Sequence, residues 1–388
     1  MNKILKYKGL SAFFLLLFAY SFYDAMNSGN SGASDENRGV VYIYLLIMLG
    51  WNAIYLLKTK VISQRKNSII PIMIGLPIWI FVCSLMNGIS WVMYVHLFLS
   101  VWWISSYQYF YRYTLYNPES IDLVKIFFII VFFFYVYMSV YAQANIALTR
   151  DQEHIVLNYA YNIISFVPIF LLFENKRIRL SLLVIAVVML FFSYKRGPLL
   201  ILPIMYFVYI LSTRNNSSSK TIVKVLGLLL VVIISFSVAD YYSGGYLSSR
   251  FSSEELADGS NRSEMWAMAW YDIKNRDLFT LLIGKGSGSS IKLLTSGCHN
   301  EWLEFLFSFG VIGVILYFTL GCRLIKRYLT LRKTGSSYAG VYGALVVFFW
   351  MVGFFSGFYF VHSSFYYFAS LGLIESLVYK EQLDYAKR

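Results

Sequence analysis

Long apolar runs alternate with short polar segments along almost the whole chain. Several of these runs are close in length to the ~20 residues with which an α-helix crosses a bilayer. Such runs predict membrane-spanning helices rather than strands. We therefore expect an all-α polytopic membrane protein with about 12 transmembrane helices. The apolar segments lie at 9–23, 40–57, 69–86, 90–110, 122–142, 155–173, 180–194, 198–212, 222–239, 301–320, 340–357 and 362–379.

The composition supports this class. Apolar residues make up 58% and aromatic residues 19% of the 388 residues, more than a soluble chain of this length can bury. A net charge of +13 would suggest a nucleic-acid partner in a soluble protein. Here the basic residues lie in short segments between apolar runs, which the preference of Lys and Arg for the cytoplasmic side explains better. We expect no nucleic-acid partner.

The distribution of charge predicts an orientation. With the N-terminus in the cytoplasm, most of the 33 basic residues fall in cytoplasmic segments. Both termini are then cytoplasmic, and the first apolar run is an uncleaved span because no A-x-A cleavage site follows it. We expect a single transmembrane domain over 1–388, in which 240–300 forms a large outer loop with most of the polar sequence.

The first segment with candidate chemistry is the turn Ser193–Pro198. The two flanking apolar runs, about 16 residues or ~24 Å each, are short against a hydrocarbon core of ~30 Å. We therefore expect Lys195 and Arg196 to lie below the outer surface in a wet cavity, where Gly197 and Pro198 break the helix. A guanidinium at that depth needs an anion. The alternative is that these side chains extend to the lipid headgroups.

The outer loop contains a sequence typical of an amphipathic helix, Ser260–Lys274. Asn261 and Glu264 have the spacing of an N-cap and the third helical residue, and we expect the helix to lie on the outer membrane surface. Arg262 falls in the first turn, where the helix dipole disfavours a cation, so another partner should hold it. The alternative is a surface arginine paired with Glu264 or Asp258. The apolar stripe of this helix consists of Met265, Trp266, Ala269, Trp270 and Ile273.

Glycines precede and enter the tenth apolar segment. Gly284, Gly286 and Gly288 suit either a nest for phosphate oxygens or a loop that bends tightly. Gly310 and Gly313 lie on one helix face and would let another helix approach closely.

His299 stands immediately before the same segment. An imidazole can accept a proton near neutral pH, and Glu304 or Glu301 could orient it. The alternative is a satisfied polar residue at the interface. The other histidines are His96, His154 and His362.

The remaining candidates are aromatic residues and cysteines. Aromatic residues near the outer interface suit sugar rings, although an interfacial aromatic belt explains them equally well. They are Tyr241, Tyr242, Tyr246, Trp302 and Tyr359. The three cysteines, Cys83, Cys298 and Cys322, have neither zinc-site nor disulfide-framework spacing. No Asp-x-Asp pair lies in the outer segments, so we expect neither a metal nor a cofactor.

In order and spacing, Ser193–Leu320 resembles the superfamily of O-antigen polymerases and O-antigen ligases, which are bacterial membrane glycosyltransferases. The shared features are K-R-G-P from Lys195, an arginine that opens a Trp-containing helix, G-x-G-x-G, and H-N-E-W-L-E-F-L followed by G-V-I-G. Ten residues separate His299 from Gly310, as in the family's H-x10-G pattern.

The resemblance implies a C-type glycosyltransferase fold and a sugar donor linked to undecaprenyl diphosphate, used at the periplasmic face of the inner membrane. It implies that Arg196 and Arg262 bind the diphosphate and that His299 is the base. The companion R-x10-G pattern is not matched at Arg150, because Tyr161 stands where the glycine should be. We add Lys195 to the diphosphate site and regard Glu304, Glu301, Asn300 and Gly310 as supporting residues.

These residue types suit the implied reaction. A guanidinium offers a two-donor fork to phosphate oxygens. The base would deprotonate an acceptor sugar hydroxyl as it attacks the anomeric carbon. A single displacement predicts inversion without a metal.

We predict an O-antigen or related surface polysaccharide polymerase, because the chain is unusually rich in Phe and Tyr and departs from the regular family patterns. The alternative is a ligase that transfers polysaccharide to lipid A–core. A transporter or flippase is a further alternative, disfavoured because the sequence lacks internal repeats. Expected partners are undecaprenyl-diphosphate-linked glycans as donor and acceptor and membrane lipids, and a chain-length regulator protein is a candidate.

Overall fold

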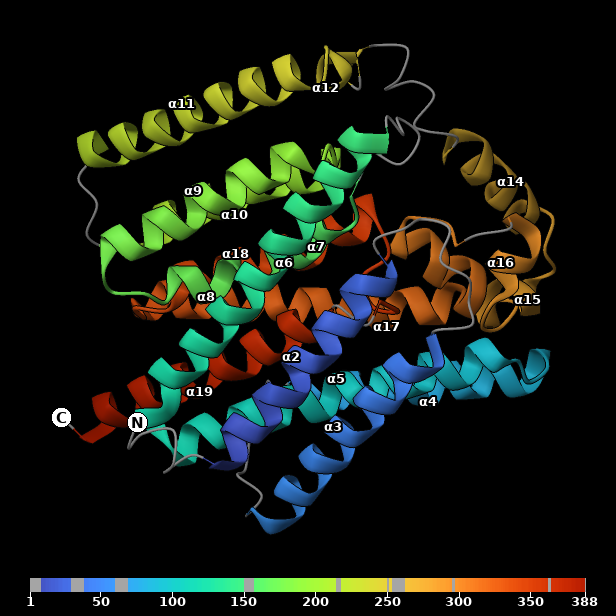
Figure 1. The fold of residues 1–388 in the computed structure, drawn as a ribbon. Helices are drawn as coiled ribbons and strands as arrows, with labels where there is room; N and C mark the ends of the chain where they lie inside the picture. The colour runs from blue at the N-terminus through green and yellow to red at the C-terminus, as the bar shows by residue number, and fades with distance from the viewer. Residues whose placement is uncertain are drawn as a thin grey trace. The chain divides into compact units, whose positions relative to one another are not determined.

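The computed structural model describes residues 8–28, 38–59, 69–149, 157–213, 218–249, 251–252, 262–294, 297–361 and 364–387. All regular structure in these residues is helical (Figure 1). The helices are α2 (Lys8–Ser28), α3 (Arg38–Lys58), α4 (Ile70–Asn87), α5 (Trp91–Tyr116), η2 (Pro118–Ser120), α6 (Ile121–Thr149), α7 (Tyr159–Ser165), α8 (Val167–Leu171), α9 (Lys176–Phe192), α10 (Arg196–Ser212), α11 (Ser218–Tyr242), α12 (Tyr246–Ser249), α14 (Arg262–Lys274), α15 (Leu278–Ile283), α16 (Ser289–Leu294), α17 (Glu301–Thr334), α18 (Ala339–Phe355) and α19 (Phe365–Lys387).

The helices follow the apolar pattern of the sequence. In the described part of the chain each predicted apolar segment coincides with a helix, except that 155–173 is divided between α7 and α8 and 301–320 is kinked at Gly310. Among the described residues, four helices are long and apolar enough to cross a membrane, as in an all-α membrane protein. The number of 12 spans and the orientation stay predictions. The four helices are Val40–Lys58, Ile70–Asn87, Pro118–Asn145 and Glu301–Thr334.

The chain divides into two compact units. Unit 1 consists of Met1–Ile62, Ser105–Leu202 and Phe365–Arg388, and unit 2 consists of Ser63–Ile104 and Pro203–Ser364. Helices α5 and α10 each contribute to both units.

Unit 1 is built around aromatic side chains. Within it, α2 packs against α3 and α6, and α7 packs against α6, α9 and α19. The ring of Phe166 lies 4.6 Å from that of Tyr366, and the Tyr366 hydroxyl is 2.7 Å from the hydroxyl of Ser21. Burial of such rings supplies most of the packing energy of a core of this kind.

Unit 2 is centred on α17, which packs against α4, α15 and α18. Trp302 near the start of α17 stacks on Trp350 of α18 with ring centroids 4.8 Å apart. Further along, a Cβ at Gly321 would lie 2.7 Å from the Trp350 ring, so this glycine permits the close approach of the two helices.

A kink at Gly310 divides α17. Gly310 has φ 66° and ψ −170°, which no helix contains, and a kink at a glycine frees carbonyls of the preceding turn. Three carbonyls of that turn have partners outside α17. Phe307 O accepts from Arg276 Nη1 at 2.8 Å, Ser308 O from Gly286 N at 2.8 Å, and Phe309 O from Trp79 Nε1 at 2.9 Å.

The glycine run before α17 is a tight loop that fits this kink. Gly284 has φ 80°, and a Cβ there would lie 2.5 Å from the backbone N of Gly310. Gly284 N donates to Thr280 O and Gly286 N to Ser308 O, both at 2.8 Å. Since these N–H groups are used within the protein, the structure favours the bent loop over the phosphate nest at this position.

Candidate active site

His299 lies in the turn that precedes α17, and its side chain is exposed. Its φ of 49° is in the left-handed region, which costs a non-glycine residue ~1 kcal/mol or more. The next residue, Asn300, caps α17 by accepting a hydrogen bond from Leu303 N at 3.0 Å. The imidazole is therefore carried by a defined turn at the start of a helix.

The backbone on the other side of His299 is also held. Trp266 of α14 donates from Nε1 to Cys298 O at 2.8 Å, and Cys298 N donates to Glu304 Oε2 at 3.0 Å. Burial, and secondly the Glu304 carboxylate, raise the pKa of the Cys298 thiol, so this thiol is protonated at neutral pH. The hydroxyls of Ser290 and Ser308 donate to Glu304 Oε1 at 2.7 and 2.8 Å.

Arg262 and Asn300 meet at one end of α18. Arg262 donates from Nη1 to Phe355 O at 2.9 Å, and Asn300 donates from Nδ2 to Phe354 O at 3.2 Å. Both carbonyls belong to the last turn of α18, where carbonyls lack a partner within the helix. The structure thus brings two predicted site segments, those of Arg262 and His299, to the same helix end.

This contact agrees with the expectation that a partner other than a surface carboxylate holds Arg262. Its described partner is the carbonyl of Phe355 rather than Glu264, and Asp258 and Asn261 lie outside the described residues. A guanidinium has five N–H donors. One donor of Arg262 binds Phe355 O, and within the described residues the others are available for a two-donor fork to phosphate oxygens.

Glu301 fixes the segment that follows α18, residues 356–361. The Glu301 side chain is 1% exposed, and its Oε2 accepts from Phe358 N at 2.5 Å. On the other side Trp103 of α5 donates from Nε1 to Tyr359 O at 2.7 Å. Sequence reasoning named Tyr359 of this segment only as an interfacial aromatic residue, because S-G-F-Y-F-V carries no charge and only its glycine indicates a special backbone.

Lys195 and Arg196 belong to unit 1, at the junction of α9 and α10. The turn spans Ser193–Lys195 and α10 begins at Arg196, so the expected helix break at Gly197 and Pro198 is wrong. Proline is tolerated there because the first helical N–H groups need no partner within the helix.

The turn before Arg196 is anchored by α7 and its preceding residues. Leu157 N donates to Ser193 O at 3.0 Å, and Lys195 Nζ donates to Asn158 Oδ1 at 2.6 Å. The same ammonium lies 5.8 Å from the ring centroid of Tyr161, within the range of a cation–π contact.

Two non-glycine residues of the described chain have a positive φ, Tyr194 at 53° and His299 at 49°. Each is in, or next to, one of the predicted site motifs, since Tyr194 directly precedes Lys195 and Arg196. Strained backbone concentrates at functional sites, so this independent geometric signal supports both motifs. Sequence alone carried no sign of it.

The predicted amphipathic helix exists as α14, but its stripe faces the protein. The expectation that this stripe lies on the membrane surface is wrong for four of its five residues, because a buried cluster of α16, α17 and the intervening turn covers them. Trp270 is the outward member, 47% exposed. The packed members are Met265, Trp266, Ala269 and Ile273, against Leu294, Cys298, Leu303 and Phe307.

A charge cluster joins α14 to the kink of α17, and sequence reasoning did not identify it. Asp272 accepts from Arg276 at 2.6 Å and from Lys285 at 2.5 Å, and the Arg276 guanidinium lies 4.3 Å from the Phe307 ring centroid. Burial alone would raise the pKa of Asp272, but the hydrogen bonds from Lys285 and Arg276 lower it below the usual value. The cluster fixes the helix that begins at Arg262.

The aromatic residues named from the sequence divide into two kinds. Tyr241 and Tyr242 are 83% and 74% exposed, as an interfacial belt requires. Trp302 and Tyr359 instead belong to the core of unit 2, where Tyr359 is fully buried. Neither of these two is an open sugar-stacking surface.

The other histidines are poorer candidates or lie elsewhere. His96 is buried and stacks on Phe360 at 3.9 Å, which is a packing role. Arg150, His154 and His362 lie outside the described residues.

Residues 181–318 match the model of the O-antigen ligase family. The match runs from α9 into α17 and therefore includes both basic motifs and His299. Over this part the chain is similar to the superfamily of O-antigen ligases and polymerases, whose members are glycosyltransferase-like membrane enzymes, and the match supports the resemblance found in the sequence. A search of curated proteins finds no match to the chain.

Proposed function

We propose that the chain is a polymerase of O-antigen or a related surface polysaccharide. It transfers a growing glycan from undecaprenyl diphosphate to the next lipid-linked repeat unit, at the periplasmic face of the inner membrane. The observation that carries the proposal is the joint anchoring of Arg262 and of the His299 turn at the end of α18. This arrangement supplies a cation and a base from segments far apart in sequence.

The exposed imidazole of His299 takes the proton. It accepts the hydrogen of an acceptor hydroxyl while that oxygen bonds to the anomeric carbon of the donor, a role worth about 10²–10⁴ in rate. The bond from the anomeric carbon to the diphosphate oxygen breaks in the same step, so the anomeric configuration inverts. The imidazolium then loses its proton to solvent.

Guanidinium groups stabilise the leaving diphosphate. The charge that develops on the phosphate oxygens is met by the N–H fork of Arg262, whose anchoring at Phe355 O orients it. The resemblance assigns the same task to Arg196, with Lys195 beside it. Electrostatic stabilisation of this kind is usually the largest single contribution to such a rate.

A ligase is the second candidate, and the description of the matching family favours it. It would use the same donor and the same residues, and it would differ in the acceptor, which is lipid A–core rather than a lipid-linked repeat.

The lipopolysaccharide gel pattern of a strain lacking this protein separates the candidates. A single repeat unit on the core supports the polymerase. Bare core with accumulated lipid-linked polymer supports the ligase, and bare core without exported units contradicts both and indicates a flippase.

A further inference from the structure

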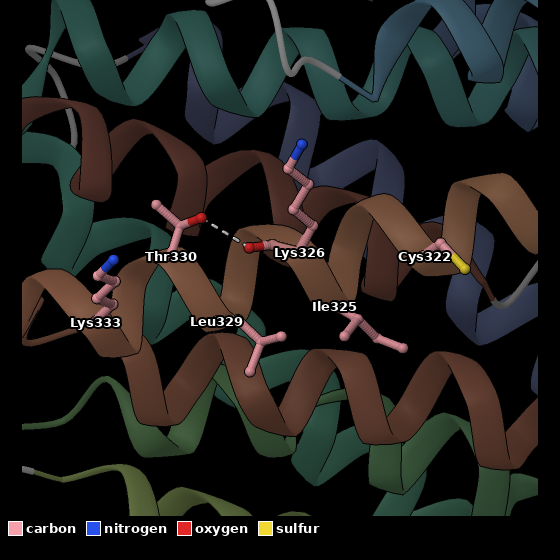
Figure 2. Close-up of a pocket in the computed structure, with 6 residues that line it drawn as sticks. All are labelled: Cys322, Ile325, Lys326, Leu329, Thr330 and Lys333. Carbon is pink, nitrogen blue, oxygen red and sulfur yellow. Dashed lines mark hydrogen bonds between the residues drawn. The ribbon is translucent and has the colours of Figure 1, made fainter.

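A groove runs along the C-terminal part of α17 (Figure 2). It has a volume of about 340 Å³ and is separate from the residues of the candidate active site. Its lining comes from one face of this helix, because the positions are separated by three, four or seven residues. The lining residues are Cys322, Ile325, Lys326, Leu329, Thr330 and Lys333.

The groove has a basic flank and an apolar flank. In Figure 2, Lys326 and Lys333 extend to one side of α17, and Ile325 and Leu329 extend to the other. Because an α-helix has about 3.6 residues per turn, the two lysines project to one side of the groove and the two aliphatic residues project to the other. The two lysines stand two turns apart, ~10.5 Å along the axis.

No acidic side chain of the described residues neutralises the basic flank. After Glu304, α17 contains no Asp or Glu. Over the described ranges, the ammonium groups of Lys326 and Lys333 form no ion pair with a carboxylate, and both side chains are exposed. Two exposed cations on one face are complementary to an anion that comes from outside the chain. Three further basic residues lie on the same part of α17: Arg323, Arg327 and Arg332.

The length of α17 indicates where this face lies in a membrane. Beyond the kink at Gly310, residues 311–334 form a helix ~36 Å long, whereas the hydrocarbon core is ~30 Å thick. If the apolar part of α17 up to residue 320 lies in that core, the helix leaves the core near Cys322, and the groove begins where lipid phosphates stand next to the first methylenes of the acyl chains.

We propose that this groove binds an anionic phospholipid. Lys326 and Lys333 take the negatively charged phosphate headgroup, and one acyl chain lies along Ile325 and Leu329. A free phosphate ester would use the basic flank alone, and a zwitterionic lipid would leave the charge of the lysines uncompensated. The groove therefore selects lipids that combine net negative charge with an acyl chain.

Lipid binding to the purified full-length protein tests this. Native mass spectrometry and thermal unfolding in detergent are measured with added phosphatidylglycerol, phosphatidylcholine or glycerol 3-phosphate. Phosphatidylglycerol is expected to bind and raise the melting temperature most. Because each lysine near an anionic lipid contributes about a factor of five, the double variant Lys326→Gln/Lys333→Gln should bind it roughly 30-fold more weakly.

The control variant is Lys176→Gln/Arg177→Gln, which removes two exposed basic residues at the start of α9. It should keep the binding of phosphatidylglycerol. The proposal is overturned if phosphatidylcholine or glycerol 3-phosphate is as effective as phosphatidylglycerol, if the α17 double variant binds as the unaltered protein does, or if both double variants lose binding equally. None of these readouts depends on glycosyl transfer.

Discussion

His299 keeps an exposed side chain in a backbone conformation that glycine would adopt at lower cost. An exposed imidazole gains little from apolar burial, and glycine would adopt this φ of 49° at lower cost. The contacts of Cys298 and Asn300 on either side hold the turn whatever the side chain of residue 299 is. Stability and activity should therefore respond in opposite directions to a change here.

The variant His299→Gly tests this separation. Glycine relieves the positive φ, so the melting temperature should be unchanged or higher. Transfer activity should fall by about 10²–10⁴, the contribution of a general base. Thermal unfolding and transfer assays on the same preparation check both. Normal activity in His299→Gly would remove the imidazole from the mechanism.

Arg262 should not be replaceable by lysine. An ammonium cannot hold Phe355 O and also form the fork to phosphate oxygens. Arg262→Lys should lower transfer activity by roughly 10- to 100-fold, the effect of losing a hydrogen bond between charged groups. The exposed Arg177→Lys in α9 is the matched control and should be fully active. Equal activities of the two variants would make Arg262 an ordinary surface cation.

At the scale of helices, the kink at Gly310 organises the site. It frees carbonyls that bind α4, the glycine loop and Arg276, and Arg276 in turn belongs to the charge cluster of α14. The helix that begins at Arg262 is thereby fixed to the helix that follows His299. The H-x10-G spacing thus has a physical meaning here, because the glycine is the kink.

Gly310→Ala should be destabilising. A Cβ would lie 2.3 Å from Leu282 O, and alanine disfavours a φ of 66°. The expected loss is about 1–3 kcal/mol, the cost of a strained backbone, before any clash is added. Gly75→Ala in α4 is the control, since a Cβ there meets nothing within 4 Å. Thermal unfolding compares them, and equal melting temperatures would contradict the close approach.

The cluster of Asp272 should stabilise the protein in a pH-dependent manner. Hydrogen bonds from Lys285 and Arg276 hold the folded-state pKa below 3.8 despite burial. The stabilisation is therefore fully present above about pH 4 and is lost as the pH falls through the folded-state pKa. The difference in melting temperature between the unaltered protein and Asp272→Asn should be constant from pH 7 to about 4 and shrink below it. A difference that is the same at pH 3 would contradict the account.

Over the whole molecule, the sequence predicts what depends on local pattern. The all-α class and the positions of the helices follow from apolar run length, and α14 follows from its spacing. The motif residues Arg262 and His299 were also identifiable. The face that α14 buries could not be predicted, because the same apolar stripe suits a membrane surface and a protein core. Only the packing of α14 against α17 decides between the two.

The partners of the site could not be predicted for a related reason. Nothing in the sequence distinguishes the carbonyls of Phe354 and Phe355 from other backbone carbonyls. They accept hydrogen bonds from Asn300 and Arg262 because α18 ends next to these two residues. Glu301 and Glu304 were named as orienting groups for His299. The described hydrogen bonds of Glu301 come from Phe358 N, and those of Glu304 come from Cys298 N and the hydroxyls of Ser290 and Ser308. Both carboxylates therefore fix neighbouring segments of the protein.

The central claim is best tested by transfer with purified components. The protein in lipid vesicles is given undecaprenyl-diphosphate-linked repeat units as the only glycan, and the products are separated on a gel. The account predicts a ladder of polymer lengths, and no ladder with His299→Gly. A protein that makes no ladder from repeat units alone, but transfers a glycan once lipid A–core is added, would contradict the polymerase, and an undiminished ladder with His299→Gly would contradict the site.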